Sequence, residues 1–369
     1  MTNEADVCVV GGGPAGLASA IALRREGMRV IVADCDHPPI DKTCGEGLMP
    51  DGVEALSRLG VAIDPRSSYD FRGVRFAGAE AMVGADFPSG RGRGIRRTAL
   101  HKAMVERAAV AGVEMLWGAR VEGLTPGGLL VDGRQISCRW IVGADGRQSR
   151  VRRWAGLERF RARGSRFGFR RHYSLPPWSE YMEIHWGEDC QMYVTPVAPG
   201  EVCLAIISRN QHLRIGEALR SFPELQCRIA DAGGSDMERG ALSATCRLQR
   251  VTAGRVALVG DASGSVDAIT GEGLRLALHQ ALALAPALAA GNLSEYEAAH
   301  RRMLRRPAFM AGLMLSLDRS AWLRRRVLPA LAARPPIFEN LLAAHVGALS
   351  PVEFVRHAAL PLGRRLLSA

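Results

Sequence analysis

Residues 6–23 of the chain read DVCVVGGGPAGLASAIAL. The apolar run at 6–10 is typical of a strand buried on both faces, and the run after Gly16 favours a helix. The pattern G-x-G-x-x-G, with its glycines at Gly11, Gly13 and Gly16, therefore lies at a strand-to-helix turn. Such a turn presents backbone N–H groups to a diphosphate, so the stretch predicts a Rossmann-like, dinucleotide-binding unit.

A second strand supports this interpretation. It is predicted at residues 29–33 and ends at Asp34, 18 residues beyond Gly16. A carboxylate at this place accepts hydrogen bonds from the hydroxyls of an adenosine ribose. Strand, glycine turn, helix and acid are thus in the order that a dinucleotide site requires.

Two later stretches repeat the theme of an apolar strand and a Gly/Asp turn. Residues 140–146 read WIVGADG, and residues 256–262 read VALVGDA. Asp261, at the end of the later strand, is well placed to bind a ribityl or ribose hydroxyl. The amides of residues 271–274 open a long helix, and they offer positive potential to a ligand that gains negative charge, as reduced flavin does.

Three motifs in this order, at residues 9–16, 142–152 and 259–262, resemble the FAD-dependent group A flavoprotein monooxygenases, which have the para-hydroxybenzoate hydroxylase fold. Residues 42–48, KTCGEGL, resemble the Cys-Gly-x-Gly segment of geranylgeranyl reductases. Residues 260–274 are similar to the flavin segment shared by those reductases and flavin halogenases. The resemblance covers about residues 5–290 and implies FAD as the cofactor.

The resemblance also implies which residues contact FAD. It places Arg97 near the diphosphate, Val121 beside the adenine, and Gly273 with Leu274 by the isoalloxazine ring. In the family, Asp145 serves both FAD and the pyridine nucleotide, and the arginines after it suit phosphates. Cys44 either faces the flavin or is a small buried residue. With the first turn, the expected cofactor residues are Gly11, Gly13, Ala15, Gly16, Asp34, Cys44, Gly45, Gly47, Arg97, Val121, Asp145, Asp261, Gly273 and Leu274.

The motifs predict a mixed α/β (α+β) fold with three parts. Residues 1–75, 95–160 and 245–290 form a discontinuous FAD-binding, Rossmann-like domain, and residues 76–94 and 161–244 form a β-sheet substrate domain. Residues 291–369 form a helical C-terminal region.

Strands of the substrate domain are expected at 166–173, 181–186, 191–197 and 201–207. The alternation of residues 182–186 predicts a sheet with one face covered, and in this fold class the sheet roofs the flavin. The substrate-pocket candidates are His172, Tyr173, His185, Trp186, Tyr193 and Thr195.

The net charge of +11 is concentrated in the C-terminal region, where residues 301–369 carry 12 arginines and three acids. These arginines alternate with large apolar side chains on predicted helices. Either the helices pack on the FAD domain with their arginines in solvent, or they make a peripheral contact with an anionic membrane. No nucleic-acid module accompanies the charge, so a nucleic acid is not an expected partner.

Other features bound the class of protein. The eight cysteines show no CxxC pair or zinc spacing, which predicts reduced thiols and no metal site. Acids near the N-terminus do not suit a signal peptide, and the longest apolar stretch is too short for a membrane span. The expected location is the cytoplasm, with or without a peripheral membrane contact.

The leading hypothesis is an NAD(P)H-dependent FAD monooxygenase that hydroxylates an apolar aromatic or polyketide-like molecule through a flavin C4a-hydroperoxide. The alternative is a geranylgeranyl-reductase-like enzyme that reduces prenyl double bonds. A third hypothesis is a non-catalytic, membrane-associated flavoprotein. The cofactor carries the chemistry in either enzyme, so no catalytic side chain is assigned, and the oligomeric state stays open.

Overall fold

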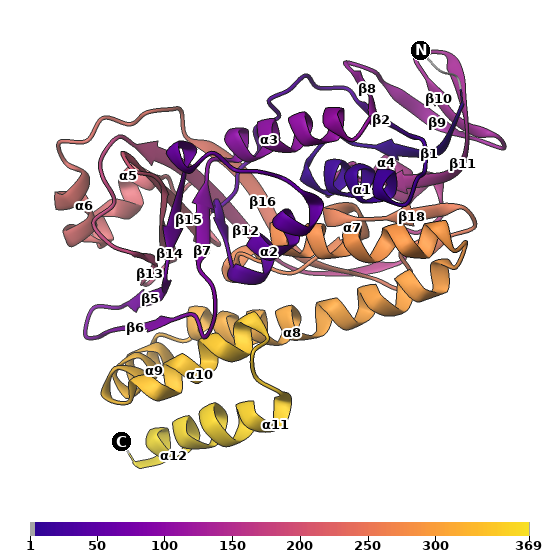
Figure 1. Cartoon of the computed structure of the whole chain (residues 1–369). Coiled ribbons are helices and arrows are strands. Elements are labelled where there is room, and N and C mark those ends of the chain that lie inside the picture. Colours follow the sequence, from indigo (N-terminus) through magenta and orange to yellow (C-terminus); the bar gives the residue numbers. More distant parts are fainter. Residues whose placement is uncertain (1–3, 369) are drawn as a thin grey trace.

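The computed structural model describes residues 4–368 as two large sheets with helices around them (Figure 1). The first sheet has the order β17-β18-β11-β1-β2-β8, and its pairs from β18 to β8 are parallel. Its strands are β1 (Glu4–Val10), β2 (Val30–Asp34), β8 (Glu114–Trp117), β11 (Arg134–Gly143), β17 (Thr252–Ala253) and β18 (Val256–Leu258).

Helices bury this sheet, as the apolar β1 sequence requires. Residues 7–10 are at most 7% exposed. The core joins the strands to α1 (Pro14–Arg25), α3 (Arg97–Val110) and α7 (Gly273–Ala289). In Figure 1, α1 lies between α3 and α7. Two further strands, β9 (Val121–Thr125) and β10 (Gly128–Val131), extend β11 as an antiparallel excursion.

The second sheet has the order β19-β16-β12-β15-β14-β13-β5-β6. Its strands are β5 (Gly73–Ala77), β6 (Met82–Asp86), β12 (Phe160–Tyr173), β13 (Tyr181–Trp186), β14 (Cys190–Ala198), β15 (Glu201–Ser208), β16 (Arg239–Leu248) and β19 (Gly264–Ser265). A small sheet of β3 (Gly47–Leu48), β7 (Gly92–Ile95) and β4 (Ser68–Phe71) lies beside it, since β4 and β7 contact β14.

The register of the second sheet sorts its side chains into two faces, because directly paired residues point to the same side. On the inner face, Tyr193 pairs with Ile184 and with Ala205, and this row packs on Ile269 and the C-terminal helices. On the outer face, Leu204 and its neighbours pack under α5 (Ile215–Ala218) and α6 (Pro223–Ile229).

The expectation that only one face is covered is therefore wrong. Glu183 and His185 point to the outer face, yet they are only 4% and 8% exposed. They are buried because α6 and the preceding turn lie over them, with the Phe222 ring 6.2 Å from the His185 ring. The four expected strands are present, and the one at 166–173 begins earlier, at Phe160.

The chain therefore has a mixed α/β fold, as the motifs predict. The division into domains stays a prediction, but the second sheet takes in residues 73–75, 160, 245–248 and 264–265, which that division gives to the FAD domain.

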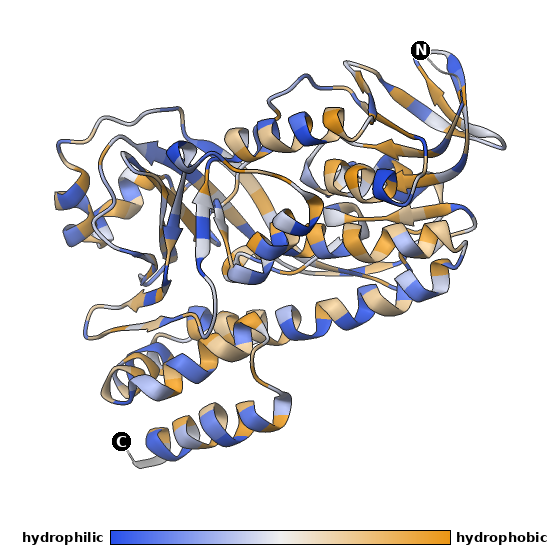
Figure 2. Ribbon diagram, in the orientation of Figure 1, coloured by the Kyte–Doolittle hydropathy of each residue, from blue (hydrophilic) through white to orange (hydrophobic). Residues whose placement is uncertain are grey.

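Helices follow residue 290: the first of them begins on α7, where Tyr296 joins the first core, and the later part of the region packs against the inner face of the second sheet. They are α8 (Leu293–Arg319), α9 (Ala321–Ala333), α10 (Pro335–Val346), α11 (Pro351–Phe354) and α12 (Leu360–Ser368), with one turn of π-helix at Val355–Ala359. Figure 2 shows hydrophilic and hydrophobic segments alternating along them. Within residues 4–368, no helix has both the length and the apolar character that crossing a membrane requires.

Candidate flavin site

The turn between β1 and α1 can be formed only by glycines at two positions. A Cβ on Gly11, where φ is +107°, would lie 2.4 Å from the carbonyl oxygen of Ala144. A Cβ on Gly16 would lie 1.8 Å from the carbonyl oxygen of Gly11. At Gly13, by contrast, the nearest atom to such a Cβ is Nη2 of Arg97 at 3.8 Å. The backbone at Gly13 is thus open toward Arg97, as an approach by a diphosphate requires.

Asp34 ends β2 beside this turn. Its Oδ2 accepts a hydrogen bond from the Gly12 N–H at 2.5 Å, and its Oδ1 accepts one from the Asp36 N–H at 2.9 Å. His101 lies below the same turn, with Nε2 2.9 Å from the Gly12 carbonyl oxygen. The side chain of Asp34 is half-buried, so it holds the turn and still has an accessible side for a ribose.

Arg97 supplies a buried cation at the first residue of α3. It is 7% exposed, and its Nε has no hydrogen-bond partner within the described part of the chain. A buried donor without a partner is costly, and a phosphate oxygen would satisfy it. Together with the open side of Gly13, this arrangement fits the diphosphate of FAD.

Asp261 lies in the turn after β18 and is surrounded by positive charge. Burial raises the pKa of its carboxyl, and the charges of Lys42, Arg97 and Arg147 act against that rise. The side chain is nevertheless accessible to solvent. A carboxylate enclosed by protein but open on one side fits the expected contact with a ribityl or ribose hydroxyl.

Two glycine loops provide the remaining expected contacts near the flavin ring. Among residues 4–368, a Cβ placed on Gly45, Gly271 or Gly273 would meet no atom within 4 Å other than those of its chain neighbours and, at Gly273, the backbone of its own helix. Gly273 is the first residue of α7, so the positive end of the helix dipole is at this loop. Leu274 and Ala15 are partly buried against the first core. Space beside these residues is what a planar ring system needs.

Cys44 is half-buried next to Gly45, and burial raises the pKa of its thiol. On the other side, Thr195 Oγ1 donates a hydrogen bond to the Gly45 carbonyl oxygen at 2.8 Å. A Cβ on Gly47 would lie 3.0 Å from Sδ of Met182. The inner face of the second sheet therefore supports the loop that carries Cys44.

Asp145 and Val121 are linked by hydrogen bonds to the same residue, Arg150. The Asp145 carboxylate accepts hydrogen bonds from Ser149 Oγ at 2.5 Å, from the Arg150 N–H at 2.7 Å and from the Val151 N–H at 3.1 Å. Arg150 also donates from Nη1 to the Val121 carbonyl oxygen at 3.2 Å. Asp145 thus fixes the start of α4 (Arg150–Trp154), while its contact with a nucleotide stays a prediction.

A buried polar network that the motifs do not reveal lies behind the Cys44 loop. Glu46 Oε1 accepts from the Arg97 N–H at 2.8 Å and from Arg170 Nη1 at 3.0 Å. His172 bridges two carboxylates, with Nε2 2.6 Å from Glu46 Oε2 and Nδ1 2.7 Å from Asp236 Oδ2. The network runs from fully buried Glu46 to Asp236, whose side chain is 26% exposed.

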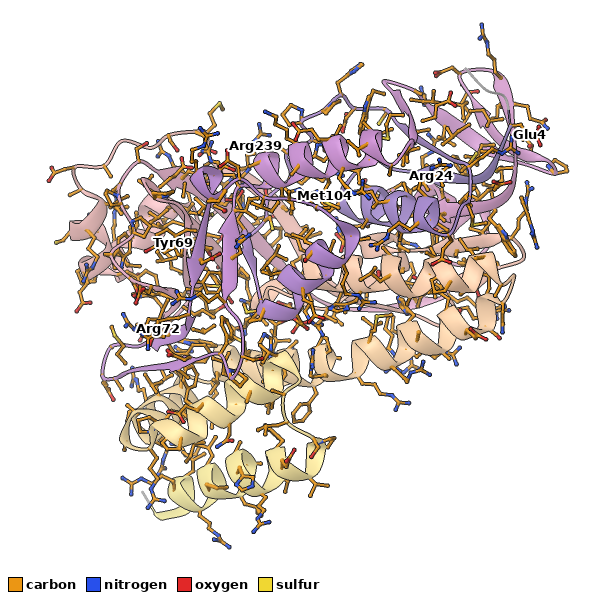
Figure 3. All side chains as sticks on the ribbon, viewed as in Figure 1. Glu4, Arg24, Tyr69, Arg72, Met104 and Arg239 are labelled. Carbon is orange, nitrogen blue, oxygen red and sulfur yellow. The ribbon has the colours of Figure 1, made fainter. Side chains whose placement is uncertain are left out.

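Charge in this network is balanced by cations of the protein. Burial opposes the charge on His172, but the hydrogen bonds and charges of Glu46 and Asp236 outweigh it and raise its pKa. Possible ligand atoms of Glu46, His172 and Cys203 lie within 4.8 Å of one another. However, the Arg170 guanidinium already neutralises Glu46, so we assign the cluster to hydrogen bonding. Arg170 also pairs with Asp41, and Arg239 (labelled in Figure 3) extends the network through an ion pair of 2.8 Å with the same carboxylate.

An apolar cavity of about 240 Å³ lies between the inner face and the C-terminal helices. Ile269 and Thr270, which directly precede the Gly271 loop, line one part of it. The side chains of Leu313 and Leu366, on α8 and α12, line another. The cavity thus connects the neighbourhood of the flavin loop with the C-terminal helices.

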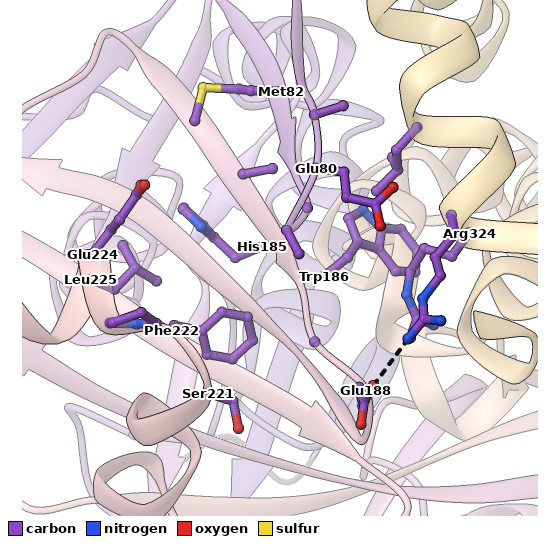
Figure 4. Close-up of a pocket in the computed structure, with 18 of the residues that line it drawn as sticks. Glu80, Met82, His185, Trp186, Glu188, Ser221, Phe222, Glu224, Leu225 and Arg324 are labelled. Carbon is purple, nitrogen blue, oxygen red and sulfur yellow. Dashed lines mark hydrogen bonds and ion pairs between the residues drawn. The ribbon is translucent and has the colours of Figure 1, made fainter. Parts of the chain in front are cut away.

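The pocket candidates fall on different sides of the sheet. His172 and Thr195 lie on the inner face beside the Cys44 loop, and Tyr193 donates from its hydroxyl to the Ile269 carbonyl oxygen at 2.8 Å. His185 instead lines a separate pocket of about 740 Å³. Figure 4 shows it there with Phe222 and Glu188, and Glu188 forms an exposed ion pair of 3.5 Å with Arg325.

Comparisons with known proteins also indicate a flavin-binding chain. A family model described as the FAD binding domain matches residues 4–214. The menaquinone reductase of Mycolicibacterium smegmatis is 29% identical over 336 residues, which cover 82% of this chain and 81% of that protein. The digeranylgeranylglycerophospholipid reductase 1 of Methanothermobacter thermautotrophicus is 27% identical over 336 residues, with the same two coverages, 82% and 81%.

The fold is also similar to that of a solved flavoprotein/dehydrogenase from Cytophaga hutchinsonii. The TM-score is 0.85 at 18% identity, and the match covers 99% of both chains. The family model matches more than half of this chain, and the resemblance drawn from the motifs is confirmed. The chain belongs to the FAD binding domain family and is an FAD-dependent oxidoreductase.

Proposed function

We propose that this protein reduces carbon–carbon double bonds in the isoprenoid chain of an apolar substrate, such as a prenylated quinone or a prenylated lipid. The apolar cavity carries the proposal. Its lining is almost entirely aliphatic, aromatic or thioether, and it ends at Ile269 and Thr270 beside the Gly271 loop. The names of the two reductases reported above support the same substrate class, because both name molecules that carry isoprenoid chains.

The reaction needs a hydride for one alkene carbon and a proton for the other, and reduced FAD supplies the hydride when it is bound. The protein must hold the double bond and keep water away. The methionine, isoleucine and leucine side chains of the cavity do both, since they offer no polar competitor. The hydrogen-bonded series Asp236–His172–Glu46 offers a route by which a proton reaches the loop beside the cofactor.

NAD(P)H is the proposed electron donor. The support is the group of arginines after Asp145, of which Arg147 acts electrostatically on Asp261. Cationic side chains at this place suit the phosphates of a pyridine nucleotide. Mixing the oxidised holoenzyme with NADH or NADPH without oxygen, and following the flavin absorbance, tests the donor separately from the substrate.

The reaction is tested under argon with chemically reduced holoenzyme. Adding a prenylated quinone or a geranylgeranyl lipid should reoxidise the flavin and give a product heavier by two hydrogen atoms in mass spectrometry. A fully saturated analogue is the control and should leave the flavin reduced. A product that forms only under air and contains one added oxygen atom would overturn the proposal.

Hydroxylation of an apolar aromatic or polyketide-like molecule is the second candidate, and the size of the cavity favours it. A volume of about 240 Å³ suits a small ring system better than a long chain, since typical ligand pockets have about 300–1,000 Å³. A prenyl chain must therefore extend past Leu313 and Leu366 toward the surface. The same experiment under air, with phenolic substrates, distinguishes the two reactions.

A further inference from the structure

The last helical segment of the chain has two apolar stripes, and only one of them is covered. At every fourth position, Phe354, Ala358, Leu362 and Leu366 face the protein: Ala358 is fully buried, and Leu362 and Leu366 line the apolar cavity. Residues four apart lie on one side of a helix. This stripe alone packs the helical segment against the rest of the protein, and the opposite face takes no part in that packing.

The opposite stripe is exposed and alternates apolar and basic side chains. It consists of Val352, Arg356, Leu360 and Arg364, also at every fourth position. Val352 is 76% exposed and Leu360 is 53% exposed. Val355 at 48% lies one position from Arg356 and widens the apolar part. We call these five residues the C-terminal stripe.

Two exposed apolar side chains of α8 lie beside the covered side of this helical segment. Phe309 is 51% exposed, and its ring lies 5.4 Å from the ring of Phe354, which holds α8 against α11. Leu313, one turn further along α8, is 38% exposed and lines the cavity. Arg305, four residues before Phe309, is exposed on the same side of α8. In Figure 1, α11 and α12 form the outermost layer of this end of the molecule.

The acids of this region offset only part of the arginine charge: Glu339 on α10 is exposed, but 12 arginines stand against three acids in residues 301–369. Asp318 is only 7% exposed and is paired with Arg166 and Arg209. Glu353 is used in a capping box with Ser350, which fixes the start of α11. The exposed side of α11 and α12 therefore presents positive charge beside apolar groups.

From this arrangement we propose that the C-terminal stripe binds to the surface of an anionic lipid bilayer. Valine and leucine side chains enter the boundary between headgroups and acyl chains, while the long arginine side chains reach the anionic headgroups. A globular partner would need a shaped acidic groove, whereas a bilayer needs only this mixture of charge and apolar area. The proposal does not depend on which reaction the flavin performs.

The position of the stripe gives it a consequence for substrate access. Its helix has the bilayer on one side and the apolar cavity on the other, because Leu362 and Leu366 line that cavity. An apolar molecule could then pass from the acyl region toward Ile269 without crossing water. Docking thus places the cavity next to the phase in which such a substrate dissolves.

The test is flotation of the FAD-loaded full chain with vesicles of equal parts phosphatidylglycerol and phosphatidylcholine, compared with phosphatidylcholine alone. Binding should require the anionic lipid and weaken with salt. The double variant Arg356→Gln/Arg364→Gln should bind about 30-fold more weakly, since each basic residue near an anionic surface contributes about 1 kcal/mol. The double variant Arg134→Gln/Arg247→Gln makes the same change of charge at exposed positions on the two sheets and should bind like the wild type.

Leu360→Glu adds a second readout, because it places a charge in the apolar part of an exposed face. It should abolish flotation while the flavin absorbance and the circular dichroism stay unchanged. Absence of binding to anionic vesicles would overturn the proposal, and so would equal loss in the two double variants. Dimerisation of the wild type that Leu360→Glu removes, seen by light scattering, would assign the stripe to a second copy of the chain instead.

Discussion

The two faces of the second sheet each bury a carboxylate–histidine pair, and the pairs differ in their surroundings. On the inner face, His172 Nε2 lies 2.6 Å from Glu46, behind the loop that carries Cys44. On the outer face, His185 Nε2 lies 3.0 Å from Glu183, close to α6. The same pair of residue types thus occurs on both sides of one sheet, but only one pair is next to the expected flavin.

The cations that accompany the pairs show what this difference means. Arg170 on the inner face is 3% exposed in its side chain and lies within ion-pair distance of Asp41, Glu46 and Asp236. Arg75, which pairs with Glu183, is 29% exposed. A fully buried group of charges depends on every member, whereas water screens the partly exposed Arg75, and the buried Glu183 keeps hydrogen bonds with His185 and Trp178. The inner face therefore holds its charges in a fixed arrangement beside the cofactor loop, and it tolerates the substitution of a charged residue less well than the outer face does.

The largest expected difference follows from removing each cation. Arg170→Met should lower the free energy of unfolding by about 4 kcal/mol, because it removes the buried cation that Glu46 shares with Asp41 and Asp236. Arg75→Met should lower it by about 1 kcal/mol or less. Urea unfolding followed by circular dichroism measures both. If Arg170→Met does not fold, Arg170→Lys keeps the charge and should be intermediate, and equal losses on the two faces would contradict the comparison.

Packing on the two faces gives the next largest difference. Ile206 is fully buried in the outer cluster, whereas Ile184 lines the apolar cavity of the inner face. Ile206→Ala should cost about 4 kcal/mol, and Ile184→Ala about 2 kcal/mol, because Ile184 already lacks neighbours on its cavity side. Thermal and urea unfolding check the order of the two losses. A larger loss for Ile184→Ala would mean that the cavity does not persist in solution.

Much of the first sheet could be predicted because its signals are local. The glycines at Gly11 and Gly16 are required by backbone contacts within one turn, so the motif alone reveals them. Asp34 also follows from its place at a strand end. The helices after residue 290 are recognisable from their amphipathic pattern, and α10 begins at the pair Pro335–Pro336, since proline is well tolerated in the first turn of a helix.

The inner network could not be predicted because its members meet only through the fold. Glu46, Arg170 and Asp236 are spread over 190 residues of sequence. One signal was present: Glu46 stands between two glycines of the flavin segment, and an acid there calls for a buried counter-charge. The sequence groups His185 with Tyr193 and Thr195 as pocket candidates, although the alternation of β13 places it on the opposite face from Ile184. The register between β13 and β14, which the sequence alone does not supply, shows that Tyr193 lies on the face of Ile184 and not on that of His185.

A pH series distinguishes the two histidines through stability. Because the pKa of His172 is raised in the folded protein, its contribution is complete below the ordinary histidine pKa and is lost as pH rises through the folded value. The difference in unfolding free energy between wild type and His172→Gln should therefore shrink from pH 5.5 to 8.5.

Several charged groups face His172, and the design must hold them constant. Glu46 and Asp236 raise its pKa, whereas Arg96 lowers it, and Arg170 and Cys203 also lie beside the Glu46–His172 pair. All of them remain in the His172→Gln variant, so the difference between the curves isolates the imidazole. A difference that grows with pH would show that His172 is neutral in the folded protein, and a constant difference would show that its pKa is not shifted; either result contradicts the prediction.

The smallest expected effect compares one hydroxyl on each face. Thr195 Oγ1 donates to the Gly45 carbonyl oxygen at 2.8 Å, and Ser208 Oγ donates to the Asp189 carbonyl oxygen at 3.0 Å. Thr195→Val and Ser208→Ala should each lower the free energy of unfolding by about 1 kcal/mol, since each removes one buried hydrogen bond.

Only Thr195→Val should also weaken FAD binding, by up to about fivefold, because it alone releases the loop beside the cofactor. Titration of apoprotein with FAD, followed by flavin fluorescence, measures this. A similar loss of affinity in Ser208→Ala would mean that the sheet transmits disturbances from both faces, and the inner face would then have no separate role in holding the flavin.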